Sequence, residues 1–388
     1  MHPITAATRT KCKGITLEIV QVHQSVPFHL LLTNKRKFGY KKNRYWLMLS
    51  IDDENLTLRK IVNDRQTLLK ESTARDRILQ LVQPSRYKYW LSIDFKNFLV
   101  KYGQGEMRNE CTLFSVHMTD NDDKKYLTKL KYSYSKFLLD KDEDESSEEL
   151  NLCHQIYKRP MEDNPPIFVS EEQLIDDQPA TDSNKNMVAV EDLDKSNQRL
   201  YKTVMGFKLS NPEHPNFTIA AIENSCREPS GWCYATLQTK ANAVTRRINS
   251  TSVRIKVGHL TFLEIWPPNH ESTVIQHSFN THGIIRILSN KLMIEFYPYL
   301  SANSQQKPFL ARLCEENEVI YFKPGLNQIY RFFNPRNTLA IIVQAFDTIA
   351  FEYISSDRKQ IKRQSGVSTD TEYEKFRRLV EKDYTGSC

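Results

Sequence analysis

Short runs of β-branched and aromatic residues, each ended by turn residues, recur through most of this 388-residue chain. They form two series, over residues 12–135 and 253–354. Within a run, apolar residues either alternate with polar ones or follow one another without a break. Alternation is typical of a half-buried strand, and an unbroken run of about four to eight apolar residues is typical of a buried one. The chain is therefore predicted to be mainly β.

The first series predicts an N-terminal β-rich domain of unknown role over residues 12–135. One segment departs from the strand pattern, because the apolar residues of Leu58–Leu81 recur at spacings of three and four, which predicts a helix. Residues 136–200 are polar and acidic and predict a linker. We expect one short docked segment in this linker, around Leu152–Tyr157.

The second series predicts a C-terminal domain over residues 201–355. Its first part, up to residue 250, has helical patterns and forms a helical preface. The strands that follow are evenly spaced, which is typical of a closed barrel or jelly roll. Residues 356–388 are polar and are expected to be a loose tail.

The net charge of +7 is unevenly distributed. Residues 140–199 hold 17 Asp and Glu against 6 Lys and Arg, a local charge of −11, so the rest of the chain carries +18. The basic, aromatic stretch Lys35–Trp46 is interpreted as an exposed hairpin rather than a nucleic-acid site, since no nucleic-acid module is recognisable. Nucleic acid is thus not an expected partner.

The sequence predicts a cytoplasmic protein that does not enter a membrane. No apolar run approaches the ~18 residues of a membrane span, and the first residues lack the apolar core of a secretory signal. The seven cysteines are scattered and contain no C-x-x-C pair. A reducing, intracellular setting is therefore expected.

The segment with the strongest chemical signal contains three of the ten histidines, His270, His277 and His282, within 13 residues. A neutral imidazole is a good metal ligand, and the interior of a small barrel can bring several together. Spacing alone leaves two interpretations open. They form a metal site, or they are loop histidines that bind no metal.

This segment resembles the cupin signature of the cysteine dioxygenases, Trp-(Gly/Pro)-x-Gly-His-x-Ser-x-(Ile/Val)-His-x-His, followed by a strand and a turn. Trp266, His270, Ser272 and His277 are in register with it. Two further segments match in order, Thr245–Ile248 before the barrel and Pro324–Asn334 near its end. The resemblance covers about residues 200–350 and implies an RmlC-like cupin jelly roll.

In that family three histidines hold iron(II). The corresponding positions here are Ile275, His277 and Tyr330, and Phe346 stands where the family has an active-site tyrosine. Gly283 occupies the position of the cysteine that animal members cross-link to that tyrosine. The resemblance assigns Arg246 or Arg247 to a substrate carboxylate.

Two functions follow from the resemblance. In the first, the domain is an Fe(II)-dependent dioxygenase that oxidises a small thiol such as cysteine. His277 and His282 would then be ligands, with His270 completing an alternative triad, and Arg246, Arg247 and Tyr330 would form the catalytic site. In the second, it is a metal-free, catalytically inactive cupin without a cofactor, a binding or scaffold protein whose N-terminal domain contacts a protein partner.

Overall fold

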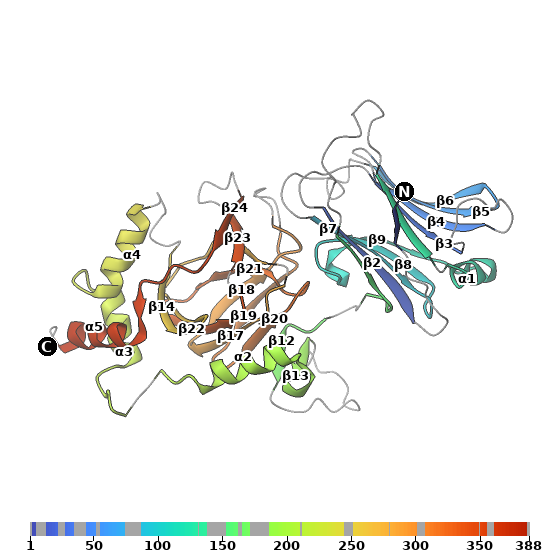
Figure 1. Ribbon diagram of the computed structural model, residues 1–388. Coiled ribbons are helices and arrows are strands. Elements are labelled where there is room, and N and C mark those ends of the chain that lie inside the picture. The colour runs from blue at the N-terminus through green and yellow to red at the C-terminus, as the bar shows by residue number, and fades with distance from the viewer. Residues whose placement is uncertain are drawn as a thin grey trace. The chain divides into compact units, whose positions relative to one another are not determined.

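A computed structural model gives the three-dimensional structure of the chain (Figure 1). It divides into two compact units, Met1–Asp163 and Asn164–Cys388, each of which is described by itself. The structure describes residues 2–4, 13–21, 28–34, 44–51, 55–73, 87–130, 132–137, 153–161, 165–170, 186–209, 212–243, 251–278, 280–300, 307–348, 350–354 and 361–385.

The N-terminal unit contains two antiparallel sheets, and the prediction that it is rich in β structure is confirmed. The rings of Phe28 and Tyr89, one from each sheet, lie 5.5 Å apart, so the sheets share a core. A short 3-10 helix (Asn109–Cys111) and helix α1 (Asn121–Leu127) flank β9. In order across the first sheet the strands are β1 (His2–Ile4), β10 (Tyr132–Phe137), β3 (Phe28–Thr33), β4 (Tyr45–Ile51), β5 (Asn55–Val62) and β6 (Arg65–Thr73). Across the second they are β11 (Cys153–Tyr157), β2 (Gly14–Gln21), β7 (Tyr87–Asp94), β8 (Leu99–Gln104) and β9 (Thr112–His117).

The helix predicted over Leu58–Leu81 is wrong for its described part, which forms β5 and β6. Asn63 and Asp64 connect the two strands, and both have positive φ, at 48° and 69°. Two such residues in succession are typical of the tight turn of a β-hairpin. Leucines at helical spacing therefore lie on a hairpin, with Leu58 buried and Leu68 51% exposed. Residues 74–81 lie outside the described residues.

The C-terminal unit is a double-sheet jelly roll. The chain passes repeatedly from one sheet to the other, which is the connectivity of this fold. In order across the first sheet the strands are β13 (Met187–Ala189), β12 (Phe168–Ser170), β20 (Val319–Phe322), β17 (Gly283–Ser289), β22 (Ala340–Phe346), β15 (Thr261–Trp266), β14 (Val253–Gly258) and β25 (Thr371–Glu372). Across the second they are β19 (Leu310–Cys314), β18 (Leu292–Phe296), β21 (Ile329–Phe333), β16 (Ile275–His277), β23 (Ala350–Ile354) and β24 (Ile361–Ser365). The mainly β prediction is confirmed.

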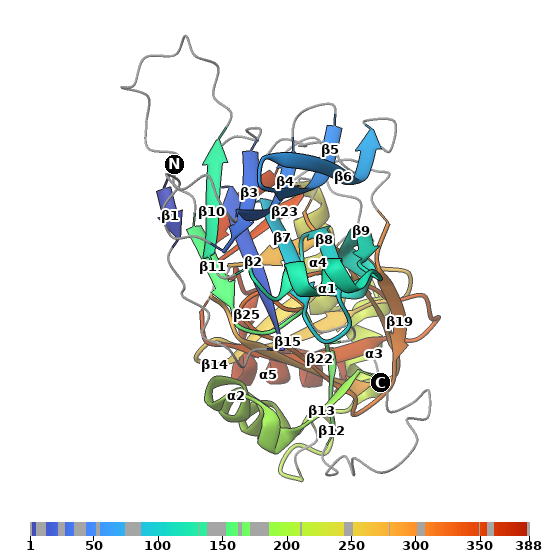
Figure 2. The ribbon, with the colours of Figure 1, turned by 90° about the vertical axis from the view of Figure 1, so that its right-hand side faces the viewer.

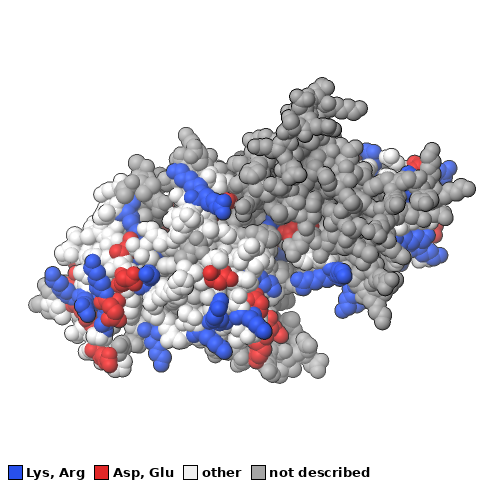
Figure 3. All heavy atoms as spheres, in the orientation of Figure 1, with Lys and Arg blue, Asp and Glu red and all other residues white. Residues whose placement is uncertain are grey.

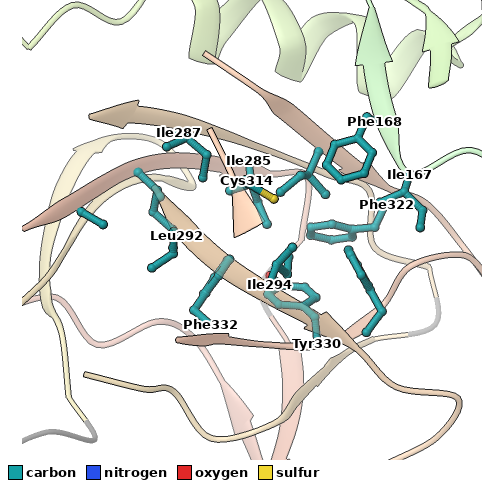
Figure 4. Close-up of a cluster of buried hydrophobic side chains, with 14 of the residues drawn as sticks. Ile167, Phe168, Ile285, Ile287, Leu292, Ile294, Cys314, Phe322, Tyr330 and Phe332 are labelled. Atoms are coloured by element: carbon teal, nitrogen blue, oxygen red, sulfur yellow. The ribbon is translucent and has the colours of Figure 1, made fainter. Parts of the chain in front are cut away.

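The core between these sheets is apolar and strongly aromatic. Ile285 and Phe322 of the first sheet contribute to the same cluster as Ile294 and Tyr330 of the second (Figure 4). The opposite face of the first sheet is covered by helices, so β15 and β22 are buried on both faces. This double burial explains their unbroken apolar sequences.

In the described part of the chain, four helices cover that outer face (Figures 1 and 2). They are α2 (Lys195–Gly206), which packs on β17 and β22, and α3 (Ile219–Arg227), α4 (Trp232–Ala243) and α5 (Tyr373–Thr385), which contact one another. A short 3-10 helix (Val190–Asp192) precedes α2. The helical preface is confirmed in the described residues.

The loose tail predicted for residues 356–388 is wrong where it is described, because α5 is part of the core. Phe376 and Val380 are fully buried against α3, α4 and β14. The carboxylate of Asp383 accepts hydrogen bonds from Ser225 Oγ at 2.6 Å and Trp232 N at 2.8 Å. The sequence showed this helix only as a short amphipathic stretch, whose apolar stripe is the face it buries.

The two units meet in the sequence at Asp163 and Asn164, within the predicted linker of residues 136–200. The expected docked segment of this range is β11, which pairs with β2. The exact domain bounds stay a prediction. On the face of the C-terminal unit in Figure 3, basic and acidic residues are interspersed. No helix among the described residues is long and apolar enough to span a membrane.

Candidate functional site

A cavity of about 320 Å³ lies between the two sheets of the C-terminal unit, toward β14 and β24. Both sheets, helix α4 and the segments before β14 and after β24 contribute to its wall. Its lining consists of Lys240, Thr251, Ser252, Arg254, Glu264, Trp266, Ser272, Thr273, Ile275, His277, Phe332, Gln344, Phe346, Thr348, Phe351, Tyr353, Gln364, Val367 and Ser368. A volume of this size suits a small organic molecule.

One wall of the cavity is polar and comes from inward-facing residues of β14, β15 and β22. Arg254 lies opposite Glu264 in the antiparallel register, and its Nε donates to the Glu264 carboxylate. At the edge of this wall, Lys240 Nζ donates to Asp370 Oδ2 at 2.6 Å and to the carbonyl of Ser252 at 2.7 Å. Burial lowers the pKa of Lys240, and the Asp370 carboxylate opposes this effect.

Gln344 is the inward residue of β22 at this wall. Its alternate neighbours Ile342 and Phe346 belong to the inner core, whereas Val343 and Ala345 face the helices. The Gln344 side chain is only 5% exposed and lines the cavity. Among the described residues no hydrogen bond of its amide group is found. The side chain therefore presents its amide to the cavity, where a bound molecule can pair with it.

The opposite wall contains His277, which forms a hydrogen bond with Tyr330, a fully buried residue outside the cavity lining. His277 Nε2 lies 2.9 Å from the Tyr330 hydroxyl. The imidazole also lies among aromatic rings, with centroids 4.6 Å from Phe322 and 5.0 Å from Phe346. Burial, together with the positive charge of Arg254, lowers the pKa of His277 to about 3. Burial likewise raises the pKa of Tyr330 well above its usual value. Both groups are therefore uncharged at neutral pH.

The three positions that the resemblance assigns to metal ligands come together in the structure. Ile275 is the register partner of Tyr330 in the β16–β21 pair, and His277 bonds to Tyr330. Their donors do not fit an iron(II) centre, however. Ile275 has no lone pair, Tyr330 is a phenol whose ionisation burial opposes, and His277 Nε2 already contacts that phenol. The structure brings no three His, Cys, Asp or Glu side chains together as metal ligands in the part of the chain it describes.

The other predicted site residues lie elsewhere. His270 Nδ1 lies 3.0 Å from the Pro268 carbonyl in the turn after β15. His282 Nδ1 lies 2.7 Å from Asp347 Oδ2, at the start of β17. Neither is among the residues that line the cavity, so the structure does not gather the three histidines. Arg246 and Arg247 lie outside the described residues.

Sequence reasoning missed Arg254, Glu264 and Gln344. The available signal was a polar residue at an inward position of an otherwise apolar strand, as in Leu-Thr-Phe-Leu-Glu-Ile-Trp and Ala-Ile-Ile-Val-Gln-Ala-Phe. Such a residue must find a partner in the fold or in a ligand.

Comparison with known proteins gives structural likenesses to cupins. No family model and no curated protein matches the chain. An oxalate oxidase structure is 20% identical over 22% of this chain and 40% of its own, with a TM-score of 0.18. A cupin-superfamily sugar phosphate isomerase from Silicibacter pomeroyi is 14% identical over 27% of this chain and 61% of its own, with a TM-score of 0.21.

A cupin domain from Bordetella pertussis Tohama I is 12% identical over 24% of this chain and 88% of its own, with a TM-score of 0.19. The chain thus spans less than two thirds of the oxalate oxidase and isomerase chains. The cupin-type jelly roll assigned to the C-terminal unit rests on its strand order and its two-sheet core.

Proposed function

We propose that the C-terminal jelly roll is a metal-free binding cupin that takes a small organic molecule into the cavity between its sheets. The observation that carries the proposal is the state of the three family metal positions. One is Ile275, and the other two, His277 and Tyr330, bond to each other inside an aromatic cluster. The fold thus retains an interior cavity while its donors no longer suit a metal.

The alternative, thiol oxidation at a non-haem iron, needs about three protein ligands and open coordination positions. Loss of an outer-shell partner alone typically lowers metal affinity or activity about 10–100-fold, and loss of a ligand is expected to cost no less. Phe346 also lacks the hydroxyl expected of the family. These residues favour binding over catalysis, and a scaffold role together with the N-terminal unit is compatible with it.

Metal analysis of the purified full chain tests this function. The protein is reconstituted with Fe(II) without oxygen, desalted, and assayed for iron content and for oxygen uptake with cysteine. We expect an iron content well below one equivalent per protein chain, and an oxygen uptake no higher than that of a heat-denatured sample. Stoichiometric iron with cysteine-dependent oxygen uptake would replace this function with the dioxygenase.

A further inference from the structure

We propose that the ligand of this cavity is a flat, uncharged aromatic molecule that carries an amide or lactam group, which pairs with Gln344. This inference rests on the proposed binding function and specifies the chemical class of the ligand. Three properties of the wall lead to it: its aromatic side chains, its unpaired carboxamide and its balanced charges.

The apolar part of the wall is rich in aromatic rings. The centroids of Trp266 and Phe332 lie 5.9 Å apart at a tilt of 51°. Aromatic rings favour offset-stacked or edge-to-face contacts with another ring. A flat aromatic molecule therefore makes better contacts here than a flexible aliphatic one. The aromatic side chains of the wall are Trp266, Phe332, Phe346, Phe351 and Tyr353.

The carboxamide of Gln344 supplies the polar specificity. A glutamine side chain offers two N–H donors and a carbonyl acceptor, and it pairs through two hydrogen bonds with a group that presents an acceptor beside a donor. Amides and lactams present such an edge. The amide of Gln344 faces the cavity and forms no hydrogen bond found among the described residues, so it is available to a ligand that supplies both bonds.

The charges of the polar wall select against an ionised ligand. Glu264, with a 1% exposed side chain, is paired with Arg254, and Lys240 is paired with Asp370. These four charges sum to zero. A ligand carboxylate in this cavity would add a negative charge. Arg254 and Lys240 cannot balance it, because each is already paired with a carboxylate of the protein, and burying an unbalanced charge is costly. An uncharged ligand avoids this cost and can still accept a hydrogen bond from the remaining N–H groups of Arg254.

The first test uses the unmodified full chain and two matched pairs of probes, nicotinamide with nicotinate and benzamide with benzoate. Each pair shares one ring and differs in the amide or carboxylate group. Dissociation constants are measured at pH 7 by calorimetry and by ligand-observed NMR. We expect the amides to bind at least about tenfold more tightly than the carboxylates. Equal or tighter binding of the carboxylates, or no binding of either amide, overturns the inference.

The second test identifies the pairing group. Gln344→Met retains the length of the side chain and removes its donors and acceptor, and we expect it to weaken amide binding about tenfold or more. Gln238→Met, on α4 and outside the cavity lining, is the matched control and is expected to leave binding unchanged. Unchanged amide binding in a folded Gln344→Met protein also overturns the inference. If this variant does not fold, the ranking of the probes on the unmodified chain decides.

These outcomes differ from those that test the proposed function. Iron content and cysteine oxidation decide whether the jelly roll is metal-free, whichever probe binds. If the carboxylates bind more tightly to an iron-free protein, the binding function stands and the amide class is wrong.

Discussion

The protonation of His277 gives a prediction that can be worked out quantitatively. Its pKa of about 3 in the folded protein compares with about 6.5 for an unperturbed histidine. His277 is 6% exposed, and the positive charge of Arg254 also disfavours the imidazolium. The folded state therefore keeps His277 neutral at pH values where the unfolded chain binds a proton.

The sign of the pH effect follows from this difference. Because the folded pKa is depressed, the neutral ring contributes fully to stability above pH 6.5, and this contribution is lost as the pH falls toward 3. Between the two pKa values, His277 lowers the free energy of unfolding by about 1.4 kcal/mol per pH unit. From pH 6.5 to 5.0 its share is thus about 2 kcal/mol.

Two measurements check this prediction. Ring NMR of the folded protein, with His277 assigned by comparison with His277→Phe, should show the neutral form down to pH 5. Urea unfolding of the C-terminal unit at pH 6.5 and 5.0 should show a pH dependence that is smaller by about 2 kcal/mol in His277→Phe. His117→Gln, which changes an exposed histidine of the other unit, serves as control. A His277 that titrates near pH 6.5 in the folded protein would refute the reasoning.

Three further predictions concern packing and ligands. Phe376→Ala should destabilise the C-terminal unit by about 3–5 kcal/mol in urea unfolding, because the Phe376 ring is fully buried. Tyr384, on the same helix, is 38% exposed, so Tyr384→Ala should destabilise the unit by less than about 1 kcal/mol. Gly283→Ala should cost about 1–3 kcal/mol or more by the same assay, since its Cβ would lie 2.0 Å from the ring of Phe322 on β20. The double variant Ile275→His, Tyr330→His should bind more iron(II), measured by metal analysis, than the two single variants bind in total, because the ligands of one ion act jointly.

The fold of the C-terminal unit was largely predictable, because burial on both faces leaves a direct signal in the sequence. The strand Ala340–Phe346 is apolar at every position but one, which only a covered sheet tolerates. The resemblance to the cysteine dioxygenases also predicted that Ile275, His277 and Tyr330 lie at one site, and the structure brings them close together.

The elements that the sequence did not predict depend on contacts between distant residues. Leucines at helical spacing fit a hairpin once Asn63 and Asp64 form a turn, and a polar C-terminal stretch becomes a buried helix only against α3 and α4. In the same way, Arg254 and Gln344 face one cavity only because β14 and β22 lie on either side of β15.

The residues packed around His277 form one set of mutually dependent contacts. The His277 imidazole is a buried polar group, and the Tyr330 hydroxyl satisfies one of its nitrogens at 2.9 Å. Phe322 and Phe346 pack on the ring, and the Phe322 ring fills the space that a side chain at residue 283 would need. Introducing a single histidine at Ile275 or Tyr330 therefore disturbs this packing without completing a set of three ligands. The arrangement keeps this wall of the cavity uncharged at neutral pH, which is compatible with the uncharged aromatic ligand that we propose.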